Sequence, residues 1–202
     1  MGLNPAAVDQ ELVDLMKEVG FREVDLGAES CCDATLRALG KDFTKRDVLQ
    51  AGRLLRQANI PTSWFLLVGA PGETEDTLQE TFETVAQEAS HWDLVIVGVG
   101  IRAYNGAPIA ERLSLENPGC THDDFLHPTH YEPDGLNLYR IKRLTKRAYR
   151  RYPNFLMYDE NSQYPAVLIT GVHKLLKWFA PRQPIWRVWL GTKRRPWREP
   201  NI

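Results

Sequence analysis

The chain has 202 residues, a formal net charge of −1 and an apolar fraction of 43%, values that are ordinary for a single globular domain of moderate size. It contains no run of about 20 apolar residues and no secretory leader, so no membrane span is expected and the cytoplasm is the expected location. Its three cysteines, Cys31, Cys32 and Cys120, are too few for a disulfide framework.

The first 60 residues predict two helices flanking a strand. Asn4-Pro5 is typical of a helix start, and apolar residues then recur at helical spacing as far as Gly20. Residues 24–28 alternate between apolar and other residues, which predicts a short strand. Residues 44–47 match a capping box for a helix whose apolar face lies within 48–58.

Two continuous apolar runs, 62–68 and 94–99, predict strands that are buried on both faces, as in a parallel sheet. A turn at 69–72 and a helix capped by Thr74 lie between them, and residues 101–105 continue the last strand toward a loop. Right-handed crossovers would make the three predicted strands parallel neighbours. We therefore expect an α/β fold of about three parallel βα units. These are too few to close a barrel, and the first strand should lie at an exposed edge.

The remaining chain predicts a separate part, so we divide the sequence into residues 1–113 and a loop plus helical, basic extension over 114–202. The extension contains a basic amphipathic helix at 136–152, a more apolar helix at 165–179 and a tail rich in Trp and Arg. The first 100 residues hold 8 Lys and Arg against 17 Asp and Glu, whereas the rest hold 17 against 9. We interpret the basic half as solvated helix faces beside the acidic half, and a nucleic-acid partner is not favoured.

Candidate functional residues follow the first two predicted strands, because parallel β/α folds gather functional groups at the carboxyl ends of their strands. Glu29 and Ser30 offer the acceptor and hydroxyl that a ribose diol requires, although they also suit a helix-capping turn. Residues 69–74 could bring backbone close to a ligand or form a tight turn. Glu73 stands where a phosphate-binding loop requires Lys, which argues against a nucleoside-triphosphate site.

Arg102 and Tyr104 follow the third predicted strand. A buried Arg needs a partner, which Glu73 or Glu29 could supply. A ligand-rich stretch comes later but lacks paired-cysteine or helical-histidine spacing, so no metal site is expected there. Its members are Cys120, His122, Asp123, Asp124, His127 and His130.

Three segments, in this order and spacing, resemble the radical S-adenosylmethionine (radical SAM) superfamily, in particular enzymes of the cobalamin-binding subgroup. Residues 26–30, followed by Lys41, are similar to the fourth-strand region, and residues 65–74 to the fifth strand with its Pro-Gly-Glu-Thr turn. Residues 101–108 are similar to the sixth-strand loop. The resemblance covers residues 8 to about 113, and the basic helix is similar to C-terminal extensions of the same subgroup.

The resemblance implies a partial radical SAM (β/α) barrel, equivalent to strands four to six, that binds S-adenosylmethionine beside a [4Fe–4S] cluster, with cobalamin as a further possible cofactor. In this family, cofactor and cluster carry the radical chemistry while the protein positions and shields it. The implied cofactor-binding residues are Glu29 and Ser30 at the ribose or nearby polar groups, the backbone of Val68, Gly69, Ala70 and Pro71 beside the adenine, Glu73 in the same turn, and Arg102 and Tyr104 facing cofactor or substrate.

The family's C-x-x-x-C-x-x-C cluster motif is absent, and nothing in the chain resembles the first three strands. Cys31, Cys32 and Cys120 have the wrong spacing, so the cluster is not expected to bind this chain alone. We expect a fragment that is inactive by itself: a truncated reading frame, one half of a split enzyme completed by a separate cluster-bearing N-terminal half, or a degenerate remnant. The alternative is a non-catalytic module that binds a partner or nucleic acid.

Overall fold

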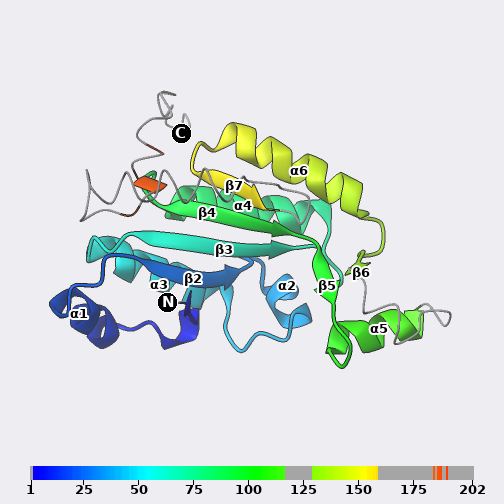
Figure 1. The fold of residues 1–202 in the computed structure, drawn as a ribbon, viewed down its shortest axis with the longest axis horizontal. Helices are drawn as coiled ribbons and strands as arrows, with labels where there is room; N and C mark the ends of the chain where they lie inside the picture. Colours follow the sequence, from blue (N-terminus) through cyan, green and yellow to red (C-terminus); the bar gives the residue numbers. More distant parts are fainter. Residues whose placement is uncertain (1, 117–128, 159–183, 185, 188–189, 191–202) are drawn as a thin grey trace, which may run out of the picture.

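A parallel five-stranded sheet forms the centre of the computed structural model, which describes residues 2–116, 129–158, 184, 186–187 and 190 (Figure 1). The parallel α/β architecture expected from the apolar runs is confirmed. In their order across the sheet, the strands are β1 (Gly2–Leu3), β2 (Val24–Glu29), β3 (Thr62–Val68), β4 (Leu94–Val99) and β7 (Phe155–Tyr158).

Two short strands extend the sheet beyond the three that the sequence predicts. β1 pairs with β2, with Leu3 opposite Leu26, and β7 pairs with β4, with Phe155 opposite Val95. The expectation that the first predicted strand lies at an edge was therefore wrong, because β2 is flanked on both sides. The last strand comes from the C-terminal part of the chain, so the two parts of the sequence share one sheet.

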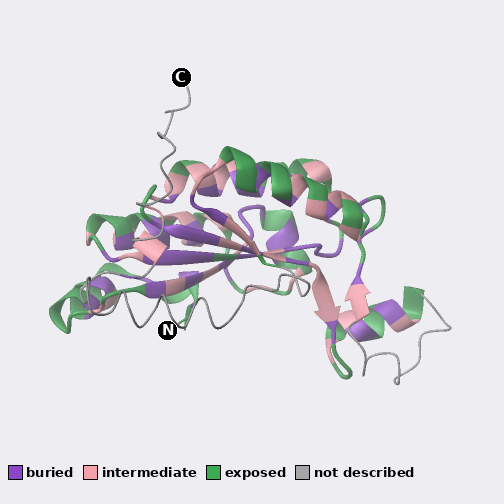
Figure 2. Cartoon of the chain, turned by 45° about the horizontal axis from the view of Figure 1, so that its top comes forward, coloured by how far each residue is buried: buried purple, intermediate pink, exposed green. Residues whose placement is uncertain are grey.

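Four helices cover one face of this sheet: α1 (Gln10–Glu18), α3 (Lys45–Gln57), α4 (Glu75–Glu88) and α6 (Leu138–Arg151). Their apolar sides share one buried cluster with alternate residues of the strands, seen as purple segments in Figure 2. Trp64 is 1% exposed within this cluster, and the rings of Phe82 and Phe155 meet edge-on at 6.0 Å between centroids. This packing buries the helix-facing residues of the strands, whereas the expectation that both faces are buried was wrong for the opposite face, where Phe65 is 38% exposed.

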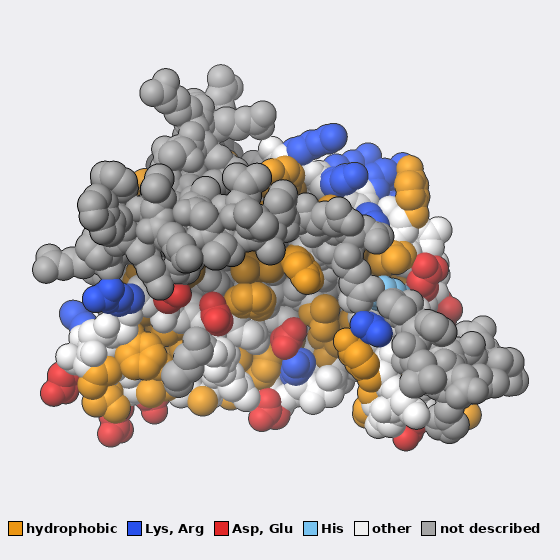
Figure 3. Space-filling view, in the orientation of Figure 1, with side chains coloured by type: hydrophobic (Ala, Val, Ile, Leu, Met, Phe, Trp, Pro, Cys, Tyr) orange, Lys and Arg blue, Asp and Glu red, His pale blue; other side chains and the backbone are white. Residues whose placement is uncertain are grey.

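The opposite face of the sheet is apolar but much more exposed. Phe65 is 38% exposed, and its row across the sheet continues through Ile96 to Leu156. The next row toward the carboxyl ends runs from Leu67 to Tyr158, which is 56% exposed. Hydrophobic side chains accordingly gather across the middle of this view in Figure 3. We call it the open face of the sheet.

The helix starts follow the sequence with one correction. Pro5 begins only a short 3₁₀ helix, η1 (Pro5–Ala7), and α1 begins after a second cap, in which the Asp9 carboxylate accepts from the Leu12 N–H at 2.8 Å. The first residue of α2 (Asp33–Ala38) is Asp33, and its carboxylate accepts from the Lys45 N–H at the start of α3. The predicted capping box of Thr44 is confirmed.

A small second unit begins where the chain leaves the sheet at Gly100, whose φ is 90°. The continuation of β4 expected through residue 105 was wrong, because β5 (Ile101–Ala103) turns away and pairs antiparallel with β6 (Thr129–Tyr131). Together with α5 (Pro108–Glu116), this two-stranded ribbon has its own apolar core and lies beyond the carboxyl ends of the sheet strands (Figure 1).

The C-terminal tail contacts the body of the protein at the opposite end of the sheet. The indole N–H of Trp186 and the Nε of Arg187 donate to the backbone oxygen of Trp92, just before β4, at 3.4 and 3.3 Å. The helix predicted at 165–179 lies outside the described residues. Within the described part of the chain, no helix has the length and apolar character needed to cross a membrane.

Candidate functional site

The carboxyl-terminal rim of the sheet brings together the residues that the sequence singled out. Glu29 ends β2 with a φ of 57°, a left-handed backbone conformation that is uncommon for residues other than glycine. Its carboxylate accepts a hydrogen bond from the Lys41 ammonium at 2.8 Å, and both side chains are partly exposed. The strained backbone and the ion pair hold this carboxylate at the rim.

Ser30 has a structural role in the fold as observed. Its side chain is buried, and its hydroxyl lies 2.8 Å from that of Thr81 on α4. Ser30 Oγ also accepts from the Cys32 N–H, while Thr81 Oγ1 accepts from the Cys31 N–H. The two hydroxyls therefore tie the loop after β2 to α4. Thr81 escaped notice in the sequence because it is a small polar residue within an apolar helix face.

The turn after β3 is organised by Glu73. Its side chain is 1% exposed, and one carboxylate oxygen accepts from the N–H groups of Gly69 and Ala70 at 2.5 and 3.3 Å. The Glu73 N–H in turn donates to the Ala70 oxygen at 3.0 Å. Gly69 has a φ of 103°, so a side chain there would strain the backbone. The turn is thus built from its own backbone around a buried carboxylate.

Burial also changes the acidity of this carboxyl. Desolvation raises the pKa of Glu73 from 4.5 to about 7, although the two backbone N–H groups partly oppose the rise. A carboxyl with this pKa gains or loses a proton close to neutral pH. The carboxylate that accepts from the Gly69 and Ala70 N–H groups therefore titrates close to neutral pH.

The end of β4 lies directly against this turn. A Cβ on Gly69 would lie 3.4 Å from the Cα of Gly100, and one on Gly100 would lie 3.0 Å from the His130 ring. On the α6 side, a Cβ on Gly69 would also meet Ile141, and one on Gly100 would meet Leu138. The absence of side chains at both glycines thus allows the turn, β4 and β6 to meet at the rim.

Arg102 and Tyr104 stand on the outgoing chain beyond this contact. The Arg102 guanidinium lies over the Tyr104 ring, with Cζ 4.8 Å from the ring centroid. The expected partners of Arg102 are engaged elsewhere, since Glu73 accepts from backbone and Glu29 from Lys41. The structure therefore places Glu29, the turn and Arg102 at one rim, and their part in cofactor binding stays a prediction.

The described cysteines do not fit a [4Fe–4S] cluster. Cys31 and Cys32 are both buried, and desolvation raises the pKa of the Cys31 thiol to about 12, whereas a ligand must be a thiolate. Among the described residues, no group of three or more His, Cys, Asp or Glu is arranged to hold a metal ion. Of the ligand-rich stretch, Cys120, His122, Asp123, Asp124 and His127 lie outside the described residues, and His130 is on β6.

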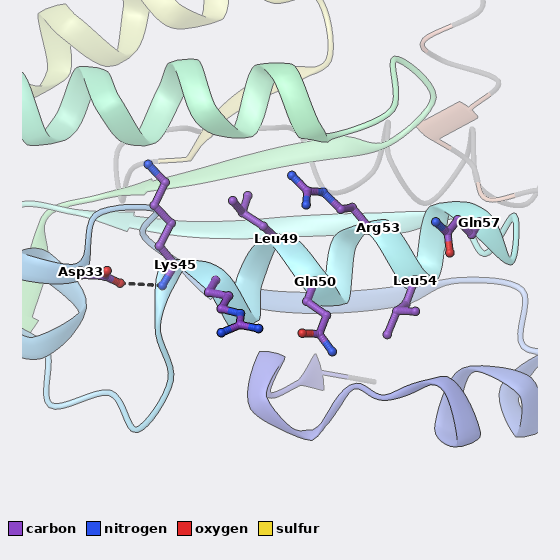
Figure 4. A pocket seen from close by; sticks show the side chains of 8 residues that line it. Asp33, Lys45, Leu49, Gln50, Arg53, Leu54 and Gln57 are labelled. Atoms are coloured by element: carbon purple, nitrogen blue, oxygen red, sulfur yellow. Dashed lines mark hydrogen bonds between the residues drawn. The ribbon is translucent and has the colours of Figure 1, made fainter.

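A surface depression along α3 is separate from the rim (Figure 4). It lies along one of the helices that cover the sheet, and two of its cations pair with carboxylates of α4. Lys45 pairs with Glu80 and Arg53 with Glu88, each at 2.7 Å. This depression is therefore explained by contacts between helices.

Comparison with known proteins finds sequence similarity over part of the chain. Residues 1–85 match the sequence model of the radical SAM superfamily. The anaerobic magnesium-protoporphyrin IX monomethyl ester cyclase of Cereibacter sphaeroides is 35% identical over 74 residues, which are 37% of this chain and 12% of the relative. The protein of the same name from Rubrivivax gelatinosus is 32% identical over 75 residues, or 37% and 14% of the two chains.

Solved structures extend the likeness to nearly the whole chain. The radical S-adenosylmethionine methyltransferase TsrM from Kitasatospora setae, with tryptophan substrate and a SAM analogue bound, superposes with a TM-score of 0.69 at 18% identity. This alignment covers 95% of the chain described here and 44% of TsrM. TsrM with cobalamin and a [4Fe–4S] cluster bound gives a TM-score of 0.67 at 19% identity, covering 95% and 42%.

These findings agree with the parallel α/β fold of the chain. The chain spans only a small part of the curated relatives and less than half of the superposed structure. Residues 1–85 are thus similar in sequence to the radical SAM superfamily, and the chain shares its fold with a radical S-adenosylmethionine methyltransferase.

Proposed function

We propose that this chain supplies the C-terminal half of a radical SAM barrel, including one side of the pocket for S-adenosylmethionine. The observation that carries this proposal is the open face of the parallel sheet. Its apolar rows are exposed on one side only, whereas parallel sheets are normally covered on both. The cluster-bearing first half of a barrel, as a separate chain or a further part of the same protein, would cover this face.

Within that pocket, we assign the rim residues to the S-adenosylmethionine ligand. The Glu29 carboxylate suits a ribose diol, and the Val68–Pro71 backbone offers a flat surface free of long side chains to an adenine ring. When bound beside a cluster, S-adenosylmethionine supplies the radical or the methyl group of the reaction. The cluster itself belongs on the other half, because the described cysteines do not fit it.

The finer reaction follows from the relatives by analogy. TsrM is a methyltransferase seen with cobalamin, and the cyclases act on a magnesium porphyrin ester. We therefore propose cobalamin-linked methyl transfer, or a related modification of an organic substrate. The fold likeness does not favour the alternative of a non-catalytic binding module.

The test is to titrate the isotope-labelled chain with S-adenosylmethionine to about 5 mM and follow the backbone amides by NMR, which detects millimolar binding. The amides of residues 29 and 68–70 should shift in a saturable way. Glu29→Gln should weaken binding about tenfold, as expected for a charged hydrogen bond, whereas the exposed Glu111→Gln on α5 should not. The absence of saturable shifts at the rim would overturn the proposal.

A further inference from the structure

Helix α6 is the most strongly charged of the described helices. Seven of its 14 residues are Lys or Arg, and none is Asp or Glu. Its inward side is buried through Ile141, Thr145 and Ala148. Its outward side is exposed, as the green segments of α6 show in Figure 2, and Lys and Arg side chains gather over it in Figure 3. This charge therefore faces solvent on the helix-covered side of the sheet, away from the open face.

On the side next to α4, the cations of α6 pair with carboxylates. The Arg140 guanidinium donates through two nitrogens to the Glu75 carboxylate, and the bond from Nη2 is 2.8 Å long. Further along the helix, Nη1 of Arg151 lies 3.9 Å from the Glu83 carboxylate. Since α4 has five acidic residues and no Lys or Arg, α6 already packs beside one acidic helix in this way.

A second set of cations points outward. Arg143, Lys146 and Arg150 are three and four residues apart, so they form one line on the exposed side of α6, which we call the cationic stripe. Tyr139 lies on the same line about one turn before Arg143 and is 75% exposed. Within the described part of the chain, no salt bridge joins the stripe to a carboxylate. Like charges at these spacings repel, so an anion that covers the stripe would stabilise the helix.

The chemistry of the stripe favours a protein partner over an extended polyanion. Tyr and Arg are enriched among the residues that dominate binding at protein interfaces. A nucleic acid or an anionic membrane presents charge over a large area, so it would also face the acidic helix α4 beside α6. A short acidic segment can contact the stripe alone, because exposed charges more than about 10 Å away are largely screened at physiological salt.

We propose that the cationic stripe, with Tyr139 at one end, binds an acidic helix of a partner protein. Glu residues three and four positions apart on such a helix match the spacing of the stripe. An apolar residue at the end of that line would pack on the exposed Tyr139 ring. The pair of Arg140 and Glu75 shows the same chemistry between two helices of this chain. The stripe lies outside the candidate site, so this inference does not depend on the proposed function.

The test titrates the full isotope-labelled chain with a helical, Ala-rich peptide of about 20 residues that carries Glu at the spacing of the stripe and Leu at each end. One control peptide has Gln in place of Glu, and a second has the same composition with its Glu residues distributed around the helix. The amides of α6 should shift with the Glu-stripe peptide, which should bind at least about tenfold more tightly than either control. Raising NaCl to about 0.5 M should weaken this binding.

Variants of the chain assign the binding to the stripe. Arg143→Gln, Lys146→Gln and Arg150→Gln combined should weaken binding of the Glu-stripe peptide at least about tenfold. This variant should be at least as stable to urea as the wild type, because it loses repulsion between like charges. The matched control removes the same number of positive charges from exposed positions on other elements and should bind like the wild type: Lys17→Gln, Arg37→Gln and Arg46→Gln.

Three outcomes would overturn the inference. Equal binding of the peptide with distributed Glu would show that the stripe responds to net charge and not to a helix of matching spacing. Tighter binding of single-stranded oligothymidylate, or of vesicles rich in phosphatidylserine, would assign the stripe to a nucleic acid or a membrane surface. Unchanged affinity in the stripe variant would place the peptide elsewhere on the chain. None of these results bears on S-adenosylmethionine binding at the rim, so the proposed function is tested separately.

Discussion

The indole of Trp64 lies directly over Gly52, so closely that a Cβ at position 52 would come within 2.2 Å of the ring atom Cη2. Trp64 points from β3 toward α3, and Gly52 is the residue of α3 that makes room for it. Alanine is preferred over glycine in helices by about 1 kcal/mol. Gly52→Ala should nevertheless destabilise the protein by about 1–3 kcal/mol through overpacking, measured by urea unfolding.

Two further variants separate this contact from helix propensity. Gln50→Ala, at an exposed position of the same helix, should leave stability unchanged or slightly higher. In a Trp64→Leu background, Gly52→Ala should cost much less, because the ring that it clashes with is gone. An equal cost in both backgrounds would contradict the proposed contact.

The buried carboxyl of Glu73 should make stability depend on pH. Its pKa is higher in the fold than the ordinary 4.5, so the native protein holds this proton more tightly than the unfolded chain. The resulting stability is fully present below pH about 4.5 and is lost as the pH rises through about 7. Glu73→Gln should remove this loss, so urea midpoints of the two proteins should diverge across that range in favour of the variant.

Asp93 provides a check on that measurement. Desolvation also raises its pKa, so it contributes a pH dependence of the same sign to both proteins. The difference between wild type and Glu73→Gln therefore isolates Glu73. Parallel pH profiles for the two proteins would show that the Glu73 carboxyl titrates as in the unfolded chain.

The hydroxyl pair of Ser30 and Thr81 should couple the loop after β2 to α4. Thr81→Val keeps the side-chain shape but leaves the Cys31 N–H without its acceptor, which should cost about 1–3 kcal/mol in urea unfolding. Thr81→Ser retains the hydroxyl and should cost less. A double-mutant cycle with Ser30→Ala should give a nonzero coupling energy, and strictly additive losses would count against the pair.

The Cys31 thiol should be chemically inert in the folded protein. Its pKa of about 12 and complete burial leave almost no thiolate at pH 8. Peptide mapping after iodoacetamide treatment should show Cys31 alkylated at least about 100-fold more slowly than in urea. Replacing Cys31 and Cys32 with Ser should leave iron uptake after anaerobic reconstitution unchanged. Rapid alkylation, or iron lost with these thiols, would contradict the assignment.

The parts of the fold that the sequence predicted are those with strong local patterns. The runs at 62–68 and 94–99 became β3 and β4, and the caps of Thr44 and Thr74 start α3 and α4 as expected. The edge strands escaped prediction because their residues have too little pattern. β1 has two residues and β7 has four, and both exist through pairing with a longer neighbour.

The candidate site was likewise predictable only in part. Its location was predictable, because Glu29, the Gly69 turn and Arg102 each follow a strand of one parallel sheet. The hydrogen-bond partners of these residues could not be predicted. Glu73 accepts from two backbone N–H groups rather than from Arg102, a choice that depends on the turn folding back on itself. Long-range partners such as Thr81 become visible only once α4 is docked on the sheet.

The ribbon and the sheet have separate apolar cores, joined through the chain at Gly100. Because the two cores are separate, the ribbon can unfold locally at a lower free-energy cost than the sheet. The amide protons of Ala103 and Tyr131 should therefore exchange with solvent through a smaller opening than those of Leu66 and Val97. Evolution can accordingly alter the Arg102 side of the rim without changing the global stability of the sheet.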